Sequence, residues 1–391
     1  MTHTPETAVL TGVHEHVTDA IKDPSLIRLA PNVVLARFET MKVYAALGAV
    51  RSLLDSGMVR PGQTLIDSSS GIYALALAMA CHRYGLRCHI VASTTVDATI
   101  RAQLEVLGAT VDQMPPSASL QLDQERRVRR VRALLAERPD MHWMRQYHDE
   151  VHYAGYAELA EIAERALPSG PLTVVGAVGT GASTGGLVQS LRQRDRDVRD
   201  RDRGGRGRDV RGRDGGVRHR DGDGRGRDGD GRGRNVRQGD RDVRLTGIEP
   251  FGSVSFGSER LSDPEAIIAG IGSSIPFGNV RHTLYDRLHW VDFRYAMAGA
   301  VGLLREHAVF AGLSTGAAYL AARWEARAEP ERMFLVIGAD TGHRYVDKVF
   351  SRHQDALDPD LLFPVEVASL AELTLPWSTM DWARRAYRVG R

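Results

Sequence analysis

The sequence has 391 residues, 42% hydrophobic and 26% charged, a balance typical of a globular chain with two or three domains. No apolar run is long enough to span a bilayer, which argues against a helical membrane protein. The first residues lack a basic segment followed by an apolar one, so we expect no secretion signal and a cytoplasmic location. The formal net charge of +2 is the sum over two parts of the chain that differ in composition and charge.

Short apolar strands alternate with helical patterns along most of the sequence. The expected elements, in chain order, are a strand at 63–67, a helix at 73–83, a strand at 87–92, a helix around 97–107, and strands at 110–113, 172–178, 245–249 and 333–337. This alternation predicts an α/β fold of two parallel-sheet domains with helices on both faces. Ligands of such folds bind at the carboxyl ends of the strands.

The segment 194–244 consists mainly of arginine, aspartate and glycine, with 18 Arg and 12 Asp. It has almost nothing apolar to bury, so we expect it to be disordered. An RNA-binding tail is the functional alternative, but the interleaved aspartates cancel most of the positive field and no aromatic residue is present for base stacking. We therefore expect a tolerated loop expansion and no nucleic-acid partner.

Only three lysines accompany 48 arginines, and one of them, Lys42, lies in the apolar run 41–47. Unlike a guanidinium, a desolvated amine loses its proton and can form an imine with an aldehyde. Lys42 is therefore a candidate Schiff-base residue. The structural alternative is a lysine near a helix start whose ammonium reaches solvent. Lys22 and Lys348 have polar neighbours and are expected at the surface.

Three loops rich in glycine and hydroxyl residues precede helical patterns. Segment 179–186 has the composition of a phosphate-binding turn, because glycines let the backbone approach an anion and the next helix directs free N–H groups at it. It lacks the Lys-Ser/Thr ending of a nucleoside triphosphate loop, and the acidic residue of a dinucleotide fingerprint, about 20 positions on, would fall in the low-complexity segment. Segments 67–73 and 312–318 either bind an anion or serve only as helix caps.

Taken together and in this order, Lys42 and the three loops resemble the pyridoxal-phosphate enzymes of the cysteine synthase and cystathionine β-synthase family, which are of the tryptophan synthase β-subunit type and fold type II. Segments 19–29, 270–274 and 338–345 resemble the family's opening turn, its Gly-Ile-Gly loop and its closing Asp-Ser-Gly-Glu-Arg-Tyr segment. The resemblance covers the chain from Val17 to Phe350 outside the low-complexity segment.

The resemblance implies pyridoxal 5′-phosphate as the cofactor, with Lys42 as both its Schiff-base lysine and the catalytic base. The family's contacts to the cofactor's 3′-oxygen, phosphate and pyridine nitrogen correspond to Ile72, Gly179, Thr180, Gly181, Ala182, Ser183 and Ser314. The loop and the glutamine that bind the substrate carboxylate correspond to Ser69, Ser70, Gly71, Tyr73 and Gln146. The resemblance also implies a homodimer.

Two domains are expected from the same resemblance. Residues 1–45 and 153–391 form a large cofactor-binding domain, and residues 46–152 form a small domain that closes on the substrate. Three positions depart from the family. Ile72 replaces an asparagine that hydrogen-bonds the cofactor, Tyr73 replaces a small hydroxyl residue and narrows the substrate space, and the residues flanking Lys42 differ from the usual ones.

The reaction that the resemblance implies is β-replacement or β-elimination on a small amino acid such as O-acetylserine or O-phosphoserine, through an aminoacrylate intermediate. A serine at position 314 does not protonate the pyridine ring as an aspartate would, which favours elimination over racemisation. Segments 251–257 and 270–274 resemble the branch that makes 2,3-diaminopropionate precursors. Two alternatives are a catalytically impaired cofactor-binding protein, because of Ile72 and the flank of Lys42, and a nucleotide-binding regulator that uses 179–186.

Two histidine pairs have spacings that occur in zinc sites, but no third ligand clusters with either pair. We therefore expect solvated or capping histidines and no metal at His14, His16, His148 and His152. Cys81 and Cys88 are expected to be small core residues in a reducing compartment.

Overall fold

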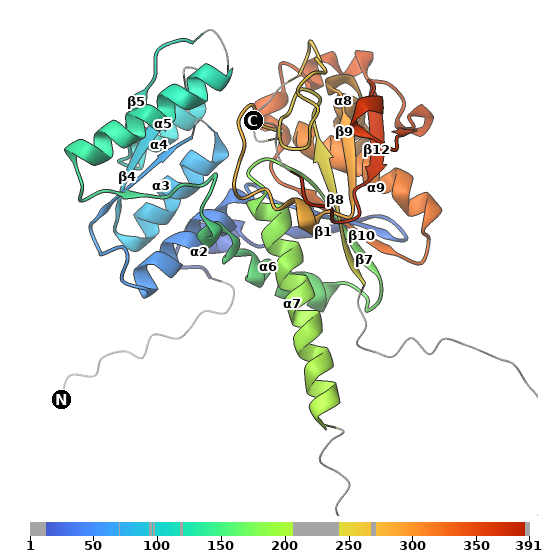
Figure 1. The fold of residues 1–391 in the computed structure, drawn as a ribbon, viewed down its shortest axis with the longest axis horizontal. Helices are drawn as coiled ribbons and strands as arrows, with labels where there is room; N and C mark the ends of the chain where they lie inside the picture. The colour runs from blue at the N-terminus through green and yellow to red at the C-terminus, as the bar shows by residue number, and fades with distance from the viewer. Residues whose placement is uncertain are drawn as a thin grey trace, which may run out of the picture.

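The computed structural model describes residues 13–69, 71–93, 96, 98–117, 120–205, 242–266 and 271–387. These residues form two sheets, one of eight strands and one of four, with helices packed against both (Figure 1). The α/β fold class expected from the alternation of strands and helices is confirmed.

The four-stranded sheet is parallel, in the order β5-β4-β3-β6. Its strands are β3 (Thr64–Ser68), β4 (Arg87–Ala92), β5 (Thr110–Gln113) and β6 (His142–Trp143). The accompanying helices are α2 (Lys42–Asp55), α3 (Ile72–Tyr84), α4 (Ala98–Val106) and α5 (Leu120–Glu137). Leu65 packs into the core beside α2 and α3, whereas Ile66 faces the core beside α5. Both faces of β3 are therefore covered, which explains why its two apolar residues are adjacent and do not alternate with polar ones.

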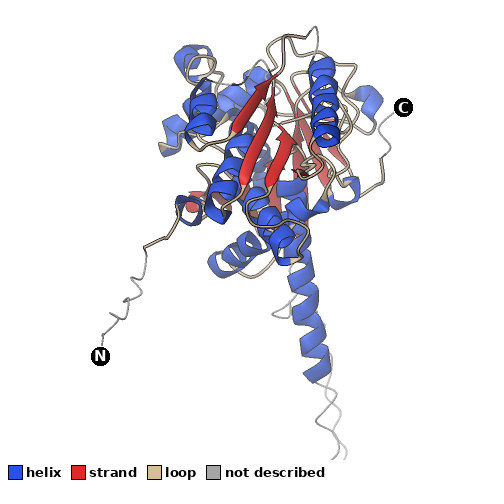
Figure 2. Ribbon diagram, turned by 90° about the vertical axis from the view of Figure 1, so that its left-hand side faces the viewer, coloured by secondary structure: helices blue, strands red, loops and turns tan. Residues whose placement is uncertain are grey.

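The eight-stranded sheet has the order β1-β2-β10-β7-β8-β9-β12-β11. Its strands are β1 (Ser25–Ala30), β2 (Val33–Arg37), β7 (Leu172–Ala177), β8 (Val243–Glu249), β9 (Arg287–Val291), β10 (Met333–Gly338), β11 (Val365–Glu366) and β12 (Trp377–Asp381). Its helices are α6 (Tyr156–Ala166), α7 (Ala182–Gly205), α8 (Phe293–His307) and α9 (Leu313–Ala328). The short helix α1 (Val17–Ile21) lies beside α3, where Asp19 pairs with Arg83 at 2.8 Å. Strands β2, β10, β7, β8 and β9 run parallel, and the antiparallel pairings are β1 with β2 and β12 with β9. Helices cover the strands of the sheet (Figure 2).

Helices α8 and α9 approach each other closely enough that only glycine fits at their crossing. A Cβ added at Gly299 would lie 2.1 Å from the Gly316 carbonyl oxygen, and one added at Gly316 would lie 2.3 Å from the Ala300 nitrogen. Contact between backbones fixes the position of α9 against the sheet, because neither helix can shift without overlap. The amino end of α9, which carries Ser314, is therefore held in place.

We expected all of segment 194–244 to be without structure, but residues at both of its ends belong to regular elements. Helix α7 continues to Gly205, and the guanidinium of Arg194 pairs with Glu161 and Glu164 of α6 at 3.0 and 2.6 Å. The Gln193 side chain also donates to Asp197, four residues on, at 2.9 Å. Pairs of this spacing favour a helix, and composition alone does not reveal them. Strand β8 begins at Val243, and residues 206–241 lie outside the described part of the chain.

Two further expectations concern composition. Cys81 and Cys88 are free thiols, and both are buried in the core beside α3, as expected. Within the described residues, none of the helices is both long enough and apolar enough to cross a membrane.

Candidate functional site

Lys42 lies beside the carboxyl end of β10, although the two segments are far apart in sequence. The residues before it run along the end of that strand: the Phe38 N–H donates to the Gly338 carbonyl and the Met41 N–H to the Ala339 carbonyl, both at 2.9 Å. Lys42 is then the first residue of α2. Its position at the end of a central parallel strand is where ligands of such folds bind.

Ser314 approaches the same segment from the other side. The Gly312 N–H donates to the Asp340 carbonyl at 3.1 Å, and Ala311 forms an antiparallel bridge with Thr341. Ser314 follows as the second residue of α9 and is partly exposed. The segments that lead into Lys42 and Ser314 therefore flank residues 339–341, which brings two of the predicted site residues together.

The glycine-rich turn lies between β7 and α7. Gly181 has a φ of +81°, and a Cβ there would lie 2.5 Å from the Asn279 carbonyl oxygen, so this position requires glycine. The first bond of α7 runs from the Gly185 N–H to the Gly181 carbonyl at 2.9 Å. Within the described residues, the N–H groups of Ala182 and Ser183 have no acceptor. Free donors at a helix start attract an anion.

The loop after β3 is held from two sides. The Ser68 carbonyl accepts from the Gln146 side-chain amide at 2.8 Å and from the Tyr147 hydroxyl at 3.1 Å. The Ser68 hydroxyl accepts from Arg127 at 2.9 Å, and the Ser69 N–H donates to the Val91 carbonyl at 3.2 Å. These bonds fix the loop at the carboxyl end of the strand.

The same loop leads into α3. Gly71 is the N-cap of this helix, and Ile72, its first residue, is partly exposed. Ser70, one of the predicted substrate-binding residues, lies outside the described residues.

Gln146 is buried, and its side chain contacts the loop rather than remaining free. Beyond the bond to Ser68, its backbone N–H donates to the Asp67 carboxylate at 3.0 Å. Asp67 also accepts from the Ser68 N–H and from the Trp143 indole, at 2.8 and 3.1 Å, while burial raises its pKa to about 6. The carboxylate of Asp67 thus joins the end of β3 to the segment after β6, a role that the sequence did not reveal.

Asn279 joins this segment to the glycine-rich turn. Its side-chain amide donates to the carbonyls of Gln146 and Asp149 at 2.9 and 3.0 Å, and its own carbonyl accepts from the Tyr153 hydroxyl at 2.6 Å. A Cβ added at Gly181 would overlap with the oxygen of this backbone carbonyl. Asn279 was not predicted as a site residue, because its partners lie more than a hundred residues away.

The amine of Lys42 differs electrostatically from that of a surface lysine. The side chain is only partly exposed, and burial lowers its pKa to about 8. No hydrogen bond or ion pair involves this amine among the described residues, whereas Lys22 pairs with Glu158 at 2.5 Å. At pH 7 about one tenth of the Lys42 amine is therefore unprotonated and able to act as a nucleophile, far more than for a surface lysine.

Tyr73 and His152 form a buried pair near Lys42. His152 is 1% exposed, so the expectation that it is solvated or capping is wrong. Its Nδ1 lies 3.0 Å from the Asp149 carbonyl, which can only accept, so this nitrogen carries the proton. Nε2 then accepts from the Tyr73 hydroxyl at 2.7 Å. Burial, with a smaller effect from the Lys42 charge, lowers the pKa of His152 to about 4.

For His16 and His148 the expectation is confirmed, because His16 caps α1 and His148 is exposed. The His16 ring accepts from the Thr18 N–H at the start of α1 at 3.2 Å, and the His148 ring accepts from the Gly278 N–H at 3.1 Å. In the described part of the chain, no three His, Cys, Asp or Glu side chains are grouped to hold a metal ion.

The low pKa of His152 makes stability depend on pH. Because its pKa is about 4 in the folded protein and 6.5 for an ordinary histidine of the unfolded chain, the unfolded chain takes up the proton first, and the free energy of unfolding falls as the pH drops through this window. His152→Gln should remove this contribution, which amounts to on the order of 3 kcal/mol. Urea unfolding between pH 7 and pH 4 measures it. An exposed histidine, His353→Gln, is the control; equal pH slopes for wild type and His152→Gln would contradict the assignment.

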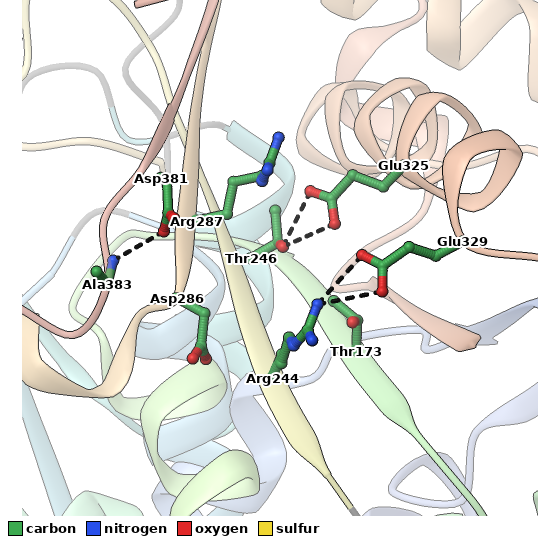
Figure 3. Close-up of a pocket in the computed structure, with 9 residues that line it drawn as sticks. All are labelled: Thr173, Arg244, Thr246, Asp286, Arg287, Glu325, Glu329, Asp381 and Ala383. Carbon is green, nitrogen blue, oxygen red and sulfur yellow. Dashed lines mark hydrogen bonds and ion pairs between the residues drawn. The ribbon is translucent and has the colours of Figure 1, made fainter. Parts of the chain in front are cut away.

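A cavity of about 350 Å³ lies elsewhere, towards the amino ends of β7, β8 and β9 (Figure 3). Its lining residues are Thr173, Arg244, Thr246, Asp286, Arg287, Glu325, Glu329, Asp381 and Ala383. The Thr246 hydroxyl donates to the Glu325 carboxylate at 3.0 Å, and Arg244 pairs with Glu329 at 3.1 Å (Figure 3). None of the predicted site residues lines this cavity, so it is separate from the region around Lys42.

Comparison with known proteins identifies the chain's relatives. A family model described as "Pyridoxal-phosphate dependent enzyme" matches residues 35–199. The N-(2-amino-2-carboxyethyl)-L-glutamate synthase of Cupriavidus metallidurans is 30% identical over 307 residues, which cover 76% of this chain and 74% of that protein.

Two solved structures share the fold. O-Acetyl serine sulfhydrylase isoform 3 from Entamoeba histolytica matches with a TM-score of 0.65 and 17% identity, over 89% of this chain and 93% of that one. The O-acetylserine-dependent cystathionine β-synthase from Helicobacter pylori matches with a TM-score of 0.65 and 19% identity, over 86% of this chain and 98% of that one. The sequence match and the shared fold confirm the resemblance seen in the motifs. The chain belongs to the cysteine synthase-like family of pyridoxal-phosphate-dependent enzymes, which have fold type II.

Proposed function

We propose that this enzyme catalyses β-replacement on a small amino acid with a leaving group on its β-carbon, and that the incoming nucleophile is an amine. The observation that carries the proposal is the partly desolvated amine of Lys42, which has no partner among the described residues and lies beside the segment that also positions Ser314. The name of the Cupriavidus relative supports the choice of nucleophile, because its product carries a 2-amino-2-carboxyethyl group on the nitrogen of glutamate.

The residues around Lys42 fit pyridoxal phosphate. Among the residues that the structure describes, the amine of Lys42 has no partner and can react with the aldehyde. The N–H groups at the start of α7, beside the turn at Gly181, likewise have no acceptor there and can bind an anion. In this proposal Gly179, Thr180, Gly181, Ala182 and Ser183 hold the phosphate, and Ser314 lies at the ring nitrogen. The family assignment favours this reading of the glycine-rich turn over the nucleotide-binding alternative.

When bound, the cofactor withdraws electrons from the α-carbon of the amino acid. Lys42 receives the α-proton at Nζ, and the leaving group departs from the β-carbon with its bonding electrons. The nitrogen of the incoming amine then forms a bond to the β-carbon and releases one proton. Lys42 returns its proton to the α-carbon, so the product keeps the original number of hydrogens there. A serine at position 314 leaves the ring nitrogen unprotonated, which favours loss of the leaving group over racemisation.

The substrate carboxylate is assigned to the loop of Ser69, Ser70 and Gly71. Gln146 supports this loop through its bond to Ser68, and a direct bond to the carboxylate would require that bond to be exchanged. Tyr73, fixed by His152, adds a bulky ring beside the loop and limits the size of the first substrate. These roles rest on the family motif together with the observed positions of the loop and the amine.

A catalytically impaired cofactor-binding protein is the second candidate function. It is favoured by Ile72, which offers no hydrogen bond at the start of α3 where the family has an asparagine. Domain closure also belongs to the proposal, and the separation of the two sheets supports it. The homodimer and the cytoplasmic location rest on the family resemblance alone, and light scattering would test the first.

The test uses the cofactor-loaded enzyme with O-acetylserine or O-phosphoserine as donor and L-glutamate or cysteine as nucleophile. We expect release of acetate or phosphate from at least one donor and a new C–N bond with glutamate, detected by mass spectrometry. Donor without nucleophile should give slow release of pyruvate and ammonia. Cofactor binding without release of either leaving group would reject the proposal in favour of the impaired protein.

A further inference from the structure

Arg344 reaches from the eight-stranded sheet to the loop that precedes α3. It lies in the 3-10 helix η3 (Gly342–Tyr345), which follows β10. A Cβ built on Gly71 would lie 3.7 Å from Nη1 of Arg344 and 3.9 Å from Nη2. The guanidinium therefore contacts the residue that caps α3, in the loop assigned to the substrate carboxylate.

The backbone that carries Arg344 is anchored on both sides. The Gly342 N–H donates to the Phe310 carbonyl at 3.3 Å, and the Val349 N–H donates to the Tyr345 carbonyl at 2.9 Å. Tyr345 is buried, with its hydroxyl 3.5 Å from the Asp340 carboxylate. The backbone of Arg344 is therefore held in place at the edge of the loop, while its exposed side chain remains able to reorient towards a ligand beside Gly71.

The guanidinium has no acceptor of its own. Within the described residues Arg344 forms no hydrogen bond or ion pair, although it is exposed. Burial raises the pKa of Asp340 to about 6 while the Arg344 charge opposes this rise, and the two groups form no ion pair. Arg127 differs, because its guanidinium is buried and bonded to Asp123 at 2.8 Å and Ser68 at 2.9 Å. Arg127 supports the loop, whereas the five N–H donors of Arg344 remain available.

The surroundings of Arg344 favour an anion. Gly71 precedes the amino end of α3, whose first turn contains no acidic residue. A helix start and a guanidinium in contact with it both attract a carboxylate, and a guanidinium can bind one through two parallel bonds. Ser69, in the same loop, is 6% exposed, whereas Arg344 is exposed. Ser69 is therefore buried, whereas the guanidinium lies at the surface.

We propose that Arg344 binds a carboxylate of the incoming amine, so that the preferred nucleophile is a dicarboxylic amino acid. This inference rests on the proposed β-replacement and assigns its nucleophile specificity. The loop of Ser69 and Gly71 holds the carboxylate of the first substrate, and Arg344 acts only when the second substrate enters. A dicarboxylic amine presents one carboxylate more than alanine or glutamine, and the unpaired guanidinium selects for it.

Steady-state kinetics of Arg344→Gln test this. We expect the KM for L-glutamate to rise about 10- to 100-fold, with the donor KM and the rate of leaving-group release changed less than twofold. Arg344→Lys should give an intermediate KM, because it keeps the charge without the paired donors. Wild type should prefer L-glutamate over L-glutamine or L-isoglutamine, each of which lacks one carboxylate. Arg344→Gln should no longer distinguish L-glutamate from the one amide that lacks the carboxylate bound by Arg344, and should still distinguish it from the other.

Arg51→Gln is the matched control. Arg51 is also exposed and lies nine residues after Lys42 along α2, about 13 Å from it, so the variant has the same change in charge away from the loop. It should leave the KM for L-glutamate unchanged. Calorimetric binding of L-glutamate to the holoenzyme adds a readout that does not need turnover, and Arg344→Gln should weaken it about as much as it raises KM.

The outcomes separate the two proposals. If wild type releases no leaving group from any donor, the β-replacement fails. If release is normal but Arg344→Gln leaves both the KM and the binding of L-glutamate unchanged, the assignment of Arg344 is wrong. A rise in the donor KM alone would also overturn it, because Arg344 would then bind the carboxylate of the first substrate. If Arg51→Gln also lost the preference for L-glutamate, the effect would come from the net charge of the protein, and the assignment of Arg344 would be wrong.

Discussion

Lys42→Ala is expected to lower the rate of leaving-group release by about 10³-fold or more, because the variant lacks both the amine that binds the cofactor and the base for the α-proton. The fold should be retained, since residue 42 is partly exposed at the start of α2 and alanine favours helices. Borohydride reduction followed by peptide mass spectrometry should find the cofactor attached to Lys42 in wild type and no attached cofactor in the variant.

Two further variants serve as controls. Lys22→Ala removes a lysine that pairs with Glu158 and should leave activity and cofactor attachment unchanged. Lys42→Arg keeps the positive charge but supplies no nucleophilic amine, so it should be as inactive as Lys42→Ala. Cofactor attached by reduction at another lysine, or activity retained in Lys42→Arg, would show that Lys42 is not the Schiff-base residue.

Gly181→Ala is expected to weaken cofactor binding at least tenfold and to destabilise the protein by about 2 kcal/mol or more. The positive φ of +81° is costly for alanine, and the added Cβ would lie 2.5 Å from the Asn279 carbonyl oxygen. Because the Asn279 oxygen belongs to the backbone and cannot rotate away, the turn must move, and the N–H groups at the start of α7 move with it. Equilibrium dialysis of pyridoxal phosphate and urea unfolding of the apoenzyme measure the two effects separately.

Gly57→Ala separates backbone strain from the close approach. Gly57 has a similar φ of +73°, but no atom lies within 4 Å of a Cβ added there. Its replacement should cost only the backbone contribution, about 1–2 kcal/mol, and leave cofactor affinity unchanged. If Gly181→Ala behaved like Gly57→Ala in both measurements, the contact with Asn279 would have no part in holding the turn.

Local patterns in the sequence determined much of the fold and pointed to the chemistry. The segments 87–92 and 333–337 predicted β4 and β10, and the second is apolar throughout, as is typical of a strand covered on both faces. Lys42 was evident because an amine was kept among apolar residues in a chain that otherwise uses arginine. The glycine-rich turn could be recognised from its composition, because the positive φ and the close backbone approach at Gly181 require glycine there.

The tertiary structure alone decided which of these segments meet. It placed the lead-ins to Lys42 and Ser314 on two sides of residues 339–341, turned the amide of Gln146 onto Ser68, and buried His152 against Tyr73. It also brought Arg344 against Gly71, although the motif that contains this arginine gives it no partner. Propensity and capping act over a few neighbouring residues, so the sequence reveals them directly. Contacts between residues hundreds of positions apart depend on how sheets and helices pack, and no local pattern encodes them.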